Sequence, residues 1–188
     1  MKYTKQLLWT LFGVLCVVQV GVIALGVMRY ERILNEGEVF YFKVLPLDPY
    51  DPFRGRYVTL RFENANNAPL AEGEIAGETS KAYALLEHHE KGDRIKEIRF
   101  KKPVQGDFLE VNVYSTTRAK KGDSNTVYFS LPFDRFYMRE DIAPKAEKVL
   151  RARSGVVVKA KLRVREGKGV IEDLMVDQTP LSQYVLTQ

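Results

Sequence analysis

Hydrophobic residues follow two different patterns along the 188-residue chain. Residues 7–28 (LLWTLFGVLCVVQVGVIALGVM) form a stretch of 22 residues without a charged side chain. Beyond residue 38, apolar residues recur in short segments that alternate with polar residues and end in turn-forming residues. The first pattern is typical of a membrane-spanning helix, and the second predicts β-strands.

A helix over residues 7–28 would be about 33 Å long at about 1.5 Å per residue, enough for a hydrocarbon core of about 30 Å. Two lysines precede the stretch, and two arginines and a glutamate follow it. The positive-inside rule then favours a cytoplasmic N-terminus in the cytoplasmic (inner) membrane. We therefore predict a cytoplasmic N-tail (1–6), a single-pass transmembrane anchor (7–28), a charged linker (29–38) and an extracytoplasmic, periplasmic-type domain (39–188).

A cleaved signal peptide is the alternative, because Ala24-Leu25-Gly26 offers small residues at the spacing that a signal peptidase reads. The apolar stretch is longer than the usual signal-peptide core of about 7 to 15 residues, which favours an uncleaved anchor. Cys16, the single cysteine, lies inside this stretch. The outer domain therefore has neither a disulfide framework nor a thiol nucleophile.

Gln19 is the single strongly polar side chain of the apolar stretch. It shares one helical face with Phe12, Cys16, Ile23 and Gly26. An amide in lipid gains about 0.6 to 2 kcal/mol from a hydrogen-bonding partner, so Gln19 predicts a contact with a second membrane helix. The alternative is that an otherwise apolar anchor tolerates one glutamine.

The outer domain reads as short strands separated by turns. Residues 39–45 are rich in aromatic and β-branched side chains, and residues 57–62 alternate, with Val58, Leu60 and Phe62 on one face. Further hairpins are predicted within residues 82–100, 108–131 and 156–176. One helix is predicted after Asp141, which suits an N-cap. The expected fold is mostly β (α+β): a transmembrane helix, then an antiparallel β-rich domain with one packed helix.

Charge and residue types exclude several functions. The net charge is +5, from 29 basic and 24 acidic residues, and this near balance disfavours nucleic-acid binding. The only histidines, His88 and His89, are adjacent and would point to opposite faces of a strand, so we expect no metal site. We predict no cofactor and no catalytic residue, since neither a Gly-x-Ser-x-Gly motif nor a Cys-His pair is present.

An anchored hydrolase that acts on peptide or cell-wall substrates is the alternative function. It would use a Ser/Thr-Lys pair, and the nearest example in the sequence is the group Ser115, Thr116, Thr117 and Lys120. These residues are predicted to lie in a turn, where serine and threonine are common for conformational reasons.

Four cations alternate with apolar residues near the C-terminus: Lys159, Lys161, Arg163 and Arg165. On a strand they would line one face, which would suit anionic lipid headgroups or an acidic partner. The favoured alternative is that they protect an edge strand from edge-to-edge association.

The stretch DPYDPFRGRYVTLRFE, residues 48–63, combines two Asp-Pro pairs, a glycine and arginines before the alternating strand. Its Asp, Pro and Gly residues are typical of a tight turn. We interpret this loop as a candidate recognition surface comprising Asp48, Asp51, Arg54, Gly55, Arg56 and Tyr57. The structural alternative is a rigid loop in which carboxylates cap backbone amides and pair with arginines.

Residues 55–62 (GRYVTLRF) resemble the motif of the GDYXXLXY family, bacterial proteins of unknown function. Gly55, Tyr57 and Leu60 match, whereas Arg56 replaces the aspartate and Phe62 the final tyrosine. Residues 136–140 (FYMRE) and 173–177 (DLMVD) also resemble the family. The resemblance implies an outward-facing, membrane-anchored domain associated with a multispanning membrane protein. The loss of the aspartate favours binding over catalysis, and hence an accessory subunit of a cell-envelope membrane complex.

Overall fold

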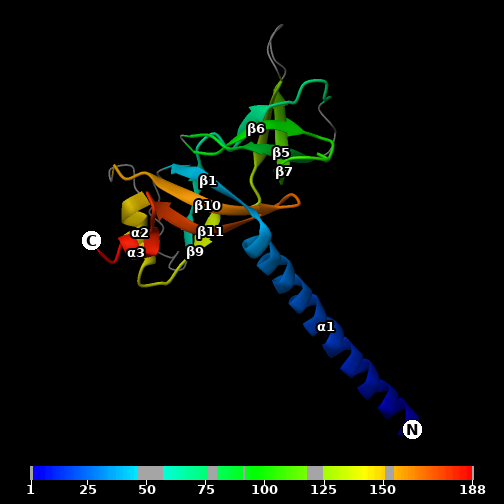
Figure 1. The fold of residues 1–188 in the computed structure, drawn as a ribbon. Coiled ribbons are helices and arrows are strands. Elements are labelled where there is room, and N and C mark those ends of the chain that lie inside the picture. Colours follow the sequence, from blue (N-terminus) through cyan, green and yellow to red (C-terminus); the bar gives the residue numbers. More distant parts are fainter. Residues whose placement is uncertain are drawn as a thin grey trace.

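A long N-terminal helix projects from a β-rich body in the computed structural model, which describes residues 2–45, 57–75, 80–90, 92–117, 125–150 and 155–187 (Figure 1). The helices are α1 (Lys2–Glu36), α2 (Ala143–Leu150) and α3 (Leu181–Tyr184). The strands are β1 (Glu38–Leu45), β2 (Tyr57–Thr59), β3 (Arg61–Phe62), β4 (Asn67–Pro69), β5 (Lys81–Glu87), β6 (Arg94–Arg99), β7 (Phe108–Thr117), β8 (Thr126–Ser130), β9 (Arg135–Tyr137), β10 (Val158–Arg165), β11 (Lys168–Val176) and β12 (Thr179–Pro180). The predicted fold class is confirmed.

Helix α1 contains the predicted apolar stretch and is, within the described residues, the one helix long and apolar enough to cross a membrane. It does not end with that stretch. The charged linker expected over residues 29–38 is helical as far as Glu36, and Gly37 alone separates it from β1. Residues 29–36 contain neither glycine nor proline, and Ile33 is only 3% exposed, so packing against the body extends the helix.

The first of two five-stranded sheets has the antiparallel order β12-β11-β10-β1-β3. Strand β10 lies between β1 and β11, so the interpretation of its cations as protection of an edge strand is wrong. The local alternation was correctly read, because Ala160, Leu162 and Val164 are buried. Alternation reports which face is buried but not which strands lie on either side.

The second sheet has the order β4-β8-β7-β5-β6, and its β5–β6 and β7–β8 hairpins confirm two predicted pairs. The strand predicted over residues 57–62 is divided at Leu60. Residues before it pair with β9, and residues after it pair with β1. The Leu60 N–H donates to the Asp134 carbonyl at 2.7 Å, while Val58, Leu60 and Phe62 are all buried as predicted. The same side of the segment therefore stays buried along residues 57–62, while the strand to which it hydrogen-bonds changes from β9 to β1.

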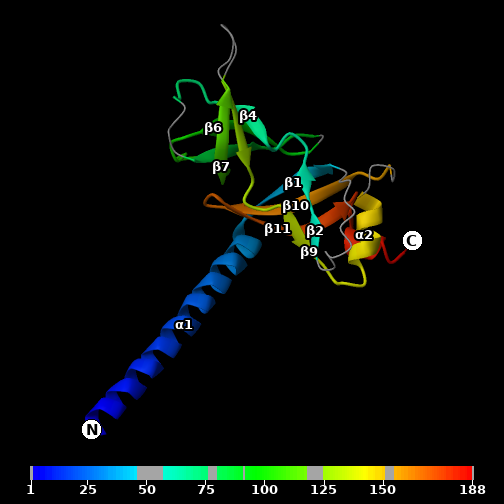
Figure 2. The ribbon, with the colours of Figure 1, turned by 180° about the vertical axis from the view of Figure 1, so that it is seen from behind.

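The two five-stranded sheets share one hydrophobic core and touch at the β10–β11 turn (Figure 2). There the Glu110 N–H of β7 donates to the Gly167 carbonyl at 2.8 Å. Helix α2 buries Ala143, Ala146 and Leu150. Asp141, predicted to cap α2, accepts hydrogen bonds from the Arg139 guanidinium at 3.1 and 2.8 Å.

Candidate functional site

The predicted recognition loop lies mostly outside the described residues. Five of its six predicted residues lie outside them: Asp48, Asp51, Arg54, Gly55 and Arg56. Tyr57, the sixth predicted residue, begins β2 and pairs with Tyr137 of β9 in the antiparallel ladder. The surface around Tyr57 is therefore the part of the predicted site that the geometry describes.

Three side chains form an outward-facing group on this small ladder, which we call the β2–β9 patch: Tyr57, Arg135 and Tyr137. The two tyrosine ring centroids are 5.6 Å apart at an interplanar angle of 58°. The Arg135 guanidinium carbon lies 5.0 Å from the centroid of the Tyr57 ring, as in a cation–π contact. Tyr137 is 67% exposed. The patch offers aromatic area and an arginine to the solvent, and the Arg135 Nε also lies 3.6 Å from an Asp134 carboxylate oxygen.

Sequence reasoning missed Arg135 and did not join Tyr137 to Tyr57. The signal was present, because residues 55–62 and 136–140 both resembled the same family. What no local pattern provides is the pairing of two strands that lie about 80 residues apart in the chain. Strands β2 and β9, which carry parts of these two segments, are neighbours in one ladder.

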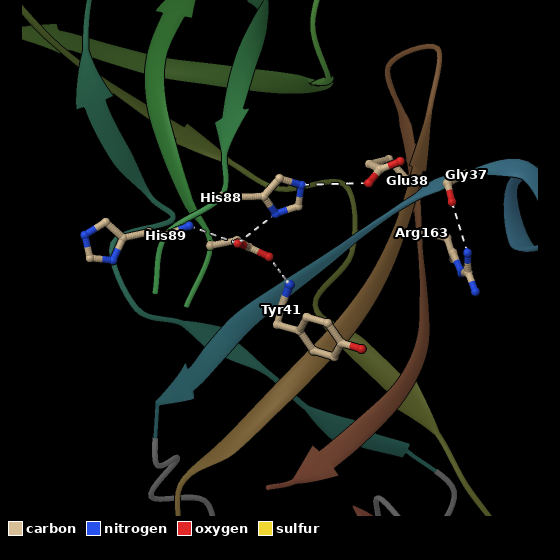
Figure 3. Close-up of polar contacts among 7 residues, drawn as sticks. Gly37, Glu38, Tyr41, His88, His89 and Arg163 are labelled. Atoms are coloured by element: carbon tan, nitrogen blue, oxygen red, sulfur yellow. Dashed lines mark hydrogen bonds and ion pairs between the residues drawn. The ribbon is translucent and has the colours of Figure 1, made fainter. Parts of the chain in front are cut away.

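A second cluster surrounds Asp93, the residue of the β5–β6 turn that directly precedes β6. Figure 3 shows its hydrogen-bonding partners Tyr41, His88 and His89. Its carboxylate accepts hydrogen bonds from the Tyr41 N–H at 2.6 Å and the His89 N–H at 3.2 Å. Its own N–H donates to the Tyr41 carbonyl at 2.9 Å. The Asp93 side chain is only 8% exposed. We call this arrangement the Asp93 clamp, and its contacts fix the β5–β6 turn on β1.

His88 extends the clamp toward the start of β1. Its ring stacks on the buried Phe40 ring at 4.5 Å and 5°. Its Nδ1 lies 3.0 Å from Asp93 Oδ1, and its Nε2 lies 3.9 Å from Glu38 Oε1 (Figure 3). The contacts of this ring are aromatic and acidic, with no hydroxyl or thiol among those observed for the described residues. The arrangement is that of a structural histidine rather than a nucleophile-activating base.

The four cations of β10 do not form a free positive face. Lys161 Nζ and Arg163 Nε each lie 2.6 Å from a carboxylate oxygen of Glu172 on β11. Partial burial would raise the pKa of Glu172, but the hydrogen bonds from Lys161 and Arg163 outweigh it and hold this pKa below its ordinary value. The pair of cations and the carboxylate thus stabilise the sheet together.

The junction between α1 and the body uses two cations of β10, Arg163 and Arg165. Arg163 donates to the Gly37 carbonyl at 3.1 Å, and Arg165 forms an ion pair with Glu36 at the end of α1. Gly37 lies so close to both elements that a Cβ there would lie 2.4 Å from the Ile33 carbonyl oxygen of α1 and 3.1 Å from backbone atoms of Val164 on β10. The helix is therefore held against the body by packing and by charge.

The residues considered for hydrolysis are arranged differently from the prediction. Ser115, Thr116 and Thr117 lie on β7, paired with β8, rather than in a turn. Lys120 lies outside the described residues. Among the residues that the structure describes, no group of three or more His, Cys, Asp or Glu side chains is placed to hold a metal ion. Gln19 is exposed on α1, within the apolar stretch.

These observations define a class of protein: an antiparallel β domain carried at the end of one long apolar helix, with the joint between them closely packed. A comparison with protein families matches residues 19–174 to the GDYXXLXY protein family. The chain belongs to this family, as its motif indicated. Comparisons with curated proteins and with solved structures gave no significant match.

Proposed function

We propose that the protein is a binding subunit of a cell-envelope membrane complex. In this proposal α1 crosses the cytoplasmic membrane with its N-terminus inside, and the β-rich body works on the outer side. The partner is a multispanning membrane protein, which the body and the Gln19 face of α1 contact together. Asp51 and Arg54, which the sequence predicts to take part in recognition, belong to the same proposal as Tyr57.

The β2–β9 patch carries this proposal. Tyrosine and arginine are the residue types that most often dominate binding energy at protein interfaces, and lost side-chain entropy is small for tyrosine. Tyr137 is 67% exposed, and Arg135 is exposed beside it. An aromatic pair with one exposed and one half-buried ring, beside an arginine and on the strand that carries the family motif or its neighbour, is better suited to recognition than to chemistry.

The joint between α1 and the body supports an anchor that is retained. Helix α1 continues through residues 24–26 without a break and ends only at Glu36. Ile33 and the Arg165–Glu36 ion pair then fix the body on the helix. A domain held in this way presents the β2–β9 patch at a constant height and angle above the membrane, which suits a subunit of a complex.

Site-specific photo-crosslinking in intact membranes tests the binding role. A crosslinker at position 137 is expected to capture one specific membrane protein, and a crosslinker at position 19 is expected to capture the same protein. Position 114 is the matched control, because Tyr114 is 65% exposed and also lies beside a second tyrosine. Equal adducts from positions 137 and 114, or only the uncrosslinked protein, would contradict the proposal.

Reporter fusions test the orientation. An alkaline phosphatase fused after Gln188 is expected to be active, because that enzyme needs an oxidising compartment for its disulfides. A fluorescent protein that folds only in the cytoplasm is expected to be dark at the same position. The opposite pair of results would place the body inside the cell.

A further inference from the structure

A cavity of about 610 Å³ lies between the last turns of α1 and the β10–β11 turn. Its apolar lining comes from α1 and consists of Val22, Leu25, Gly26, Met28 and Ile33. Its charged lining comes from both elements and consists of Arg29, Arg32, Arg165, Glu166 and Lys168. The cavity is thus apolar on one side and predominantly cationic on the other.

The change from apolar to cationic lining falls where a membrane would end. Val22 and Leu25 belong to the uncharged stretch, and Arg29 is the first charged residue after it. At about 1.5 Å per residue, Arg29 lies about 6 Å beyond Leu25 along the helix axis, and Arg32 lies about 10 Å beyond it. The apolar wall is therefore at the depth of acyl chains, and the arginines are at the depth of phosphates.

The cationic side is built on rigid structure. Glu166 and Gly167 have φ of 51° and 86°, and two successive positive values are characteristic of a tight type I′ hairpin turn. The Gly167 carbonyl accepts the hydrogen bond from Glu110 of β7, which holds the turn in place. Arg165 and Lys168, on either side of this turn, are consequently presented by a fixed element.

The charge of the cavity favours an anion. Arg165 pairs with Glu36, and its Nε lies 3.8 Å from a Glu166 carboxylate oxygen. Even with these two carboxylates counted, the four cations of the described lining leave a net positive charge. Lysine and arginine near a membrane surface each attract anionic lipid by about 1 kcal/mol, a factor of about five in binding.

We propose that this cavity binds the phosphate headgroup of an anionic phospholipid, in the leaflet next to the β domain. One acyl chain lies along Val22 and Leu25, and the phosphate accepts hydrogen bonds from Arg29 and Lys168. The proposal rests on the membrane anchoring in the proposed function, but it names a lipid where that proposal names a protein. It also replaces three of the four β10 cations predicted for lipid contact with residues of α1 and β11.

Native mass spectrometry of the full-length protein, released from nanodiscs of equal phosphatidylglycerol and phosphatidylcholine, tests the proposal. The unaltered protein is expected to retain phosphatidylglycerol preferentially. The double variant Arg29→Gln/Lys168→Gln is expected to lose that preference by roughly tenfold to thirtyfold, since two surface cations are removed. The control variant Lys101→Gln/Lys145→Gln removes the same charge at exposed positions away from the cavity and is expected to bind as before.

Equal retention of the two lipids by the unaltered protein would overturn the proposal, and so would an equal loss in both double variants. A protein adduct from a photo-crosslinker at position 32, combined with no lipid preference, would assign the cavity to an acidic partner segment instead. Melting curves of all variants by circular dichroism check that they fold. Crosslinking from position 137 is a separate readout, so failure of lipid binding and failure of the proposed function are distinguishable.

Discussion

Tyr41 and Asp93 are joined by two hydrogen bonds that run in opposite directions. The Tyr41 N–H donates to Asp93 Oδ2 at 2.6 Å, and the Tyr41 carbonyl accepts from the Asp93 N–H at 2.9 Å. Asp93 thereby gives the Tyr41 backbone hydrogen-bonding partners from outside the sheet that contains β1. Since only Gly37 separates β1 from α1, this contact also couples the second sheet to the long apolar helix.

Replacement of Asp93 by alanine is expected to destabilise the body by about 2 to 3 kcal/mol, because several hydrogen bonds to one carboxylate are lost together. The Tyr41 and His89 N–H groups would lose their acceptor, and His88 would lose its partner. Urea unfolding measures the change. The exposed Asp107→Ala is the control, and an equal effect of the two variants would show that the clamp contributes nothing specific.

The strands of the body were predictable where the signals are local. The β5–β6 and β10–β11 hairpins follow from alternating residues around glycine-containing turns, and both form. The Asp93 clamp was not predictable, because its value depends on β1, about 50 residues earlier in the chain. In the sequence, Asp93 lies between the two strands of the hairpin predicted within residues 82–100, and no local pattern indicates a partner on β1.

The candidate site was predictable to the same limited extent. Tyr57 was singled out from its motif, and the start and buried face of its strand were predicted, whereas the division at Leu60 was not. Its neighbours Arg135 and Tyr137 come from β9. They lie beside Tyr57 only because the chain before Leu60 pairs with β9, whereas the chain after Leu60 pairs with β1. Likewise, the alternation of residues 158–165 gave the buried face of β10 but gave neither its central position nor Glu172 as the partner of its cations.

Glu172→Gln is expected to lower the stability of the body at pH 7 by about 1 to 2 kcal/mol. The loss is modest because the ion pairs of Glu172 with Lys161 and Arg163 are partly exposed, and such pairs contribute less than buried ones. The pKa of Glu172 is lowered in the folded state by Lys161 and Arg163, against the opposing effect of burial. A lowered carboxyl pKa contributes stability above the unfolded pKa, and this contribution is lost as pH falls through the folded pKa.

The difference between the unaltered protein and Glu172→Gln is therefore expected to be constant from neutral pH down to about pH 5 and to shrink below the unfolded pKa of about 4.3. A pH-independent loss in Glu172→Gln would refute the electrostatic explanation.

The neighbouring Asp173 is expected to affect stability at pH 7 in the opposite direction, because burial raises its pKa. Asp173→Asn keeps an acceptor for the Leu174 N–H and is expected to be at least as stable as the unaltered protein at pH 7.

Gly37→Ala is expected to loosen the joint between α1 and the body. Its Cβ would lie 2.4 Å from the Ile33 carbonyl oxygen and 3.1 Å from backbone atoms of Val164, so the backbone must shift at a cost of about 1 to 3 kcal/mol. Amide hydrogen exchange in nanodiscs is expected to rise in β1 and in the last turn of α1. Gly21→Ala is the control, because its Cβ would have open space on α1. It is expected to leave exchange in the body unchanged, and faster exchange in the body of this variant would argue against the explanation.

Gly167→Ala is expected to weaken the contact between the two sheets. Gly167 and Gly106 have almost the same φ, 86° and 87°, so alanine at either position incurs a similar backbone cost of about 1 to 2 kcal/mol. Only at Gly167 would the Cβ also lie 2.8 Å from a ring carbon of Phe108, whereas at Gly106 it would meet open space.

The difference between these two variants isolates the close approach of the turn to β7. Gly167→Ala is expected to be less stable than Gly106→Ala by about 1 to 3 kcal/mol in urea unfolding, the cost of overpacking a well-filled contact. It is also expected to weaken phosphatidylglycerol retention, because Arg165 and Lys168 flank the same turn. Equal stability of the two variants would mean that the turn moves freely on β7, and a fixed cationic wall for the cavity would then have no structural basis.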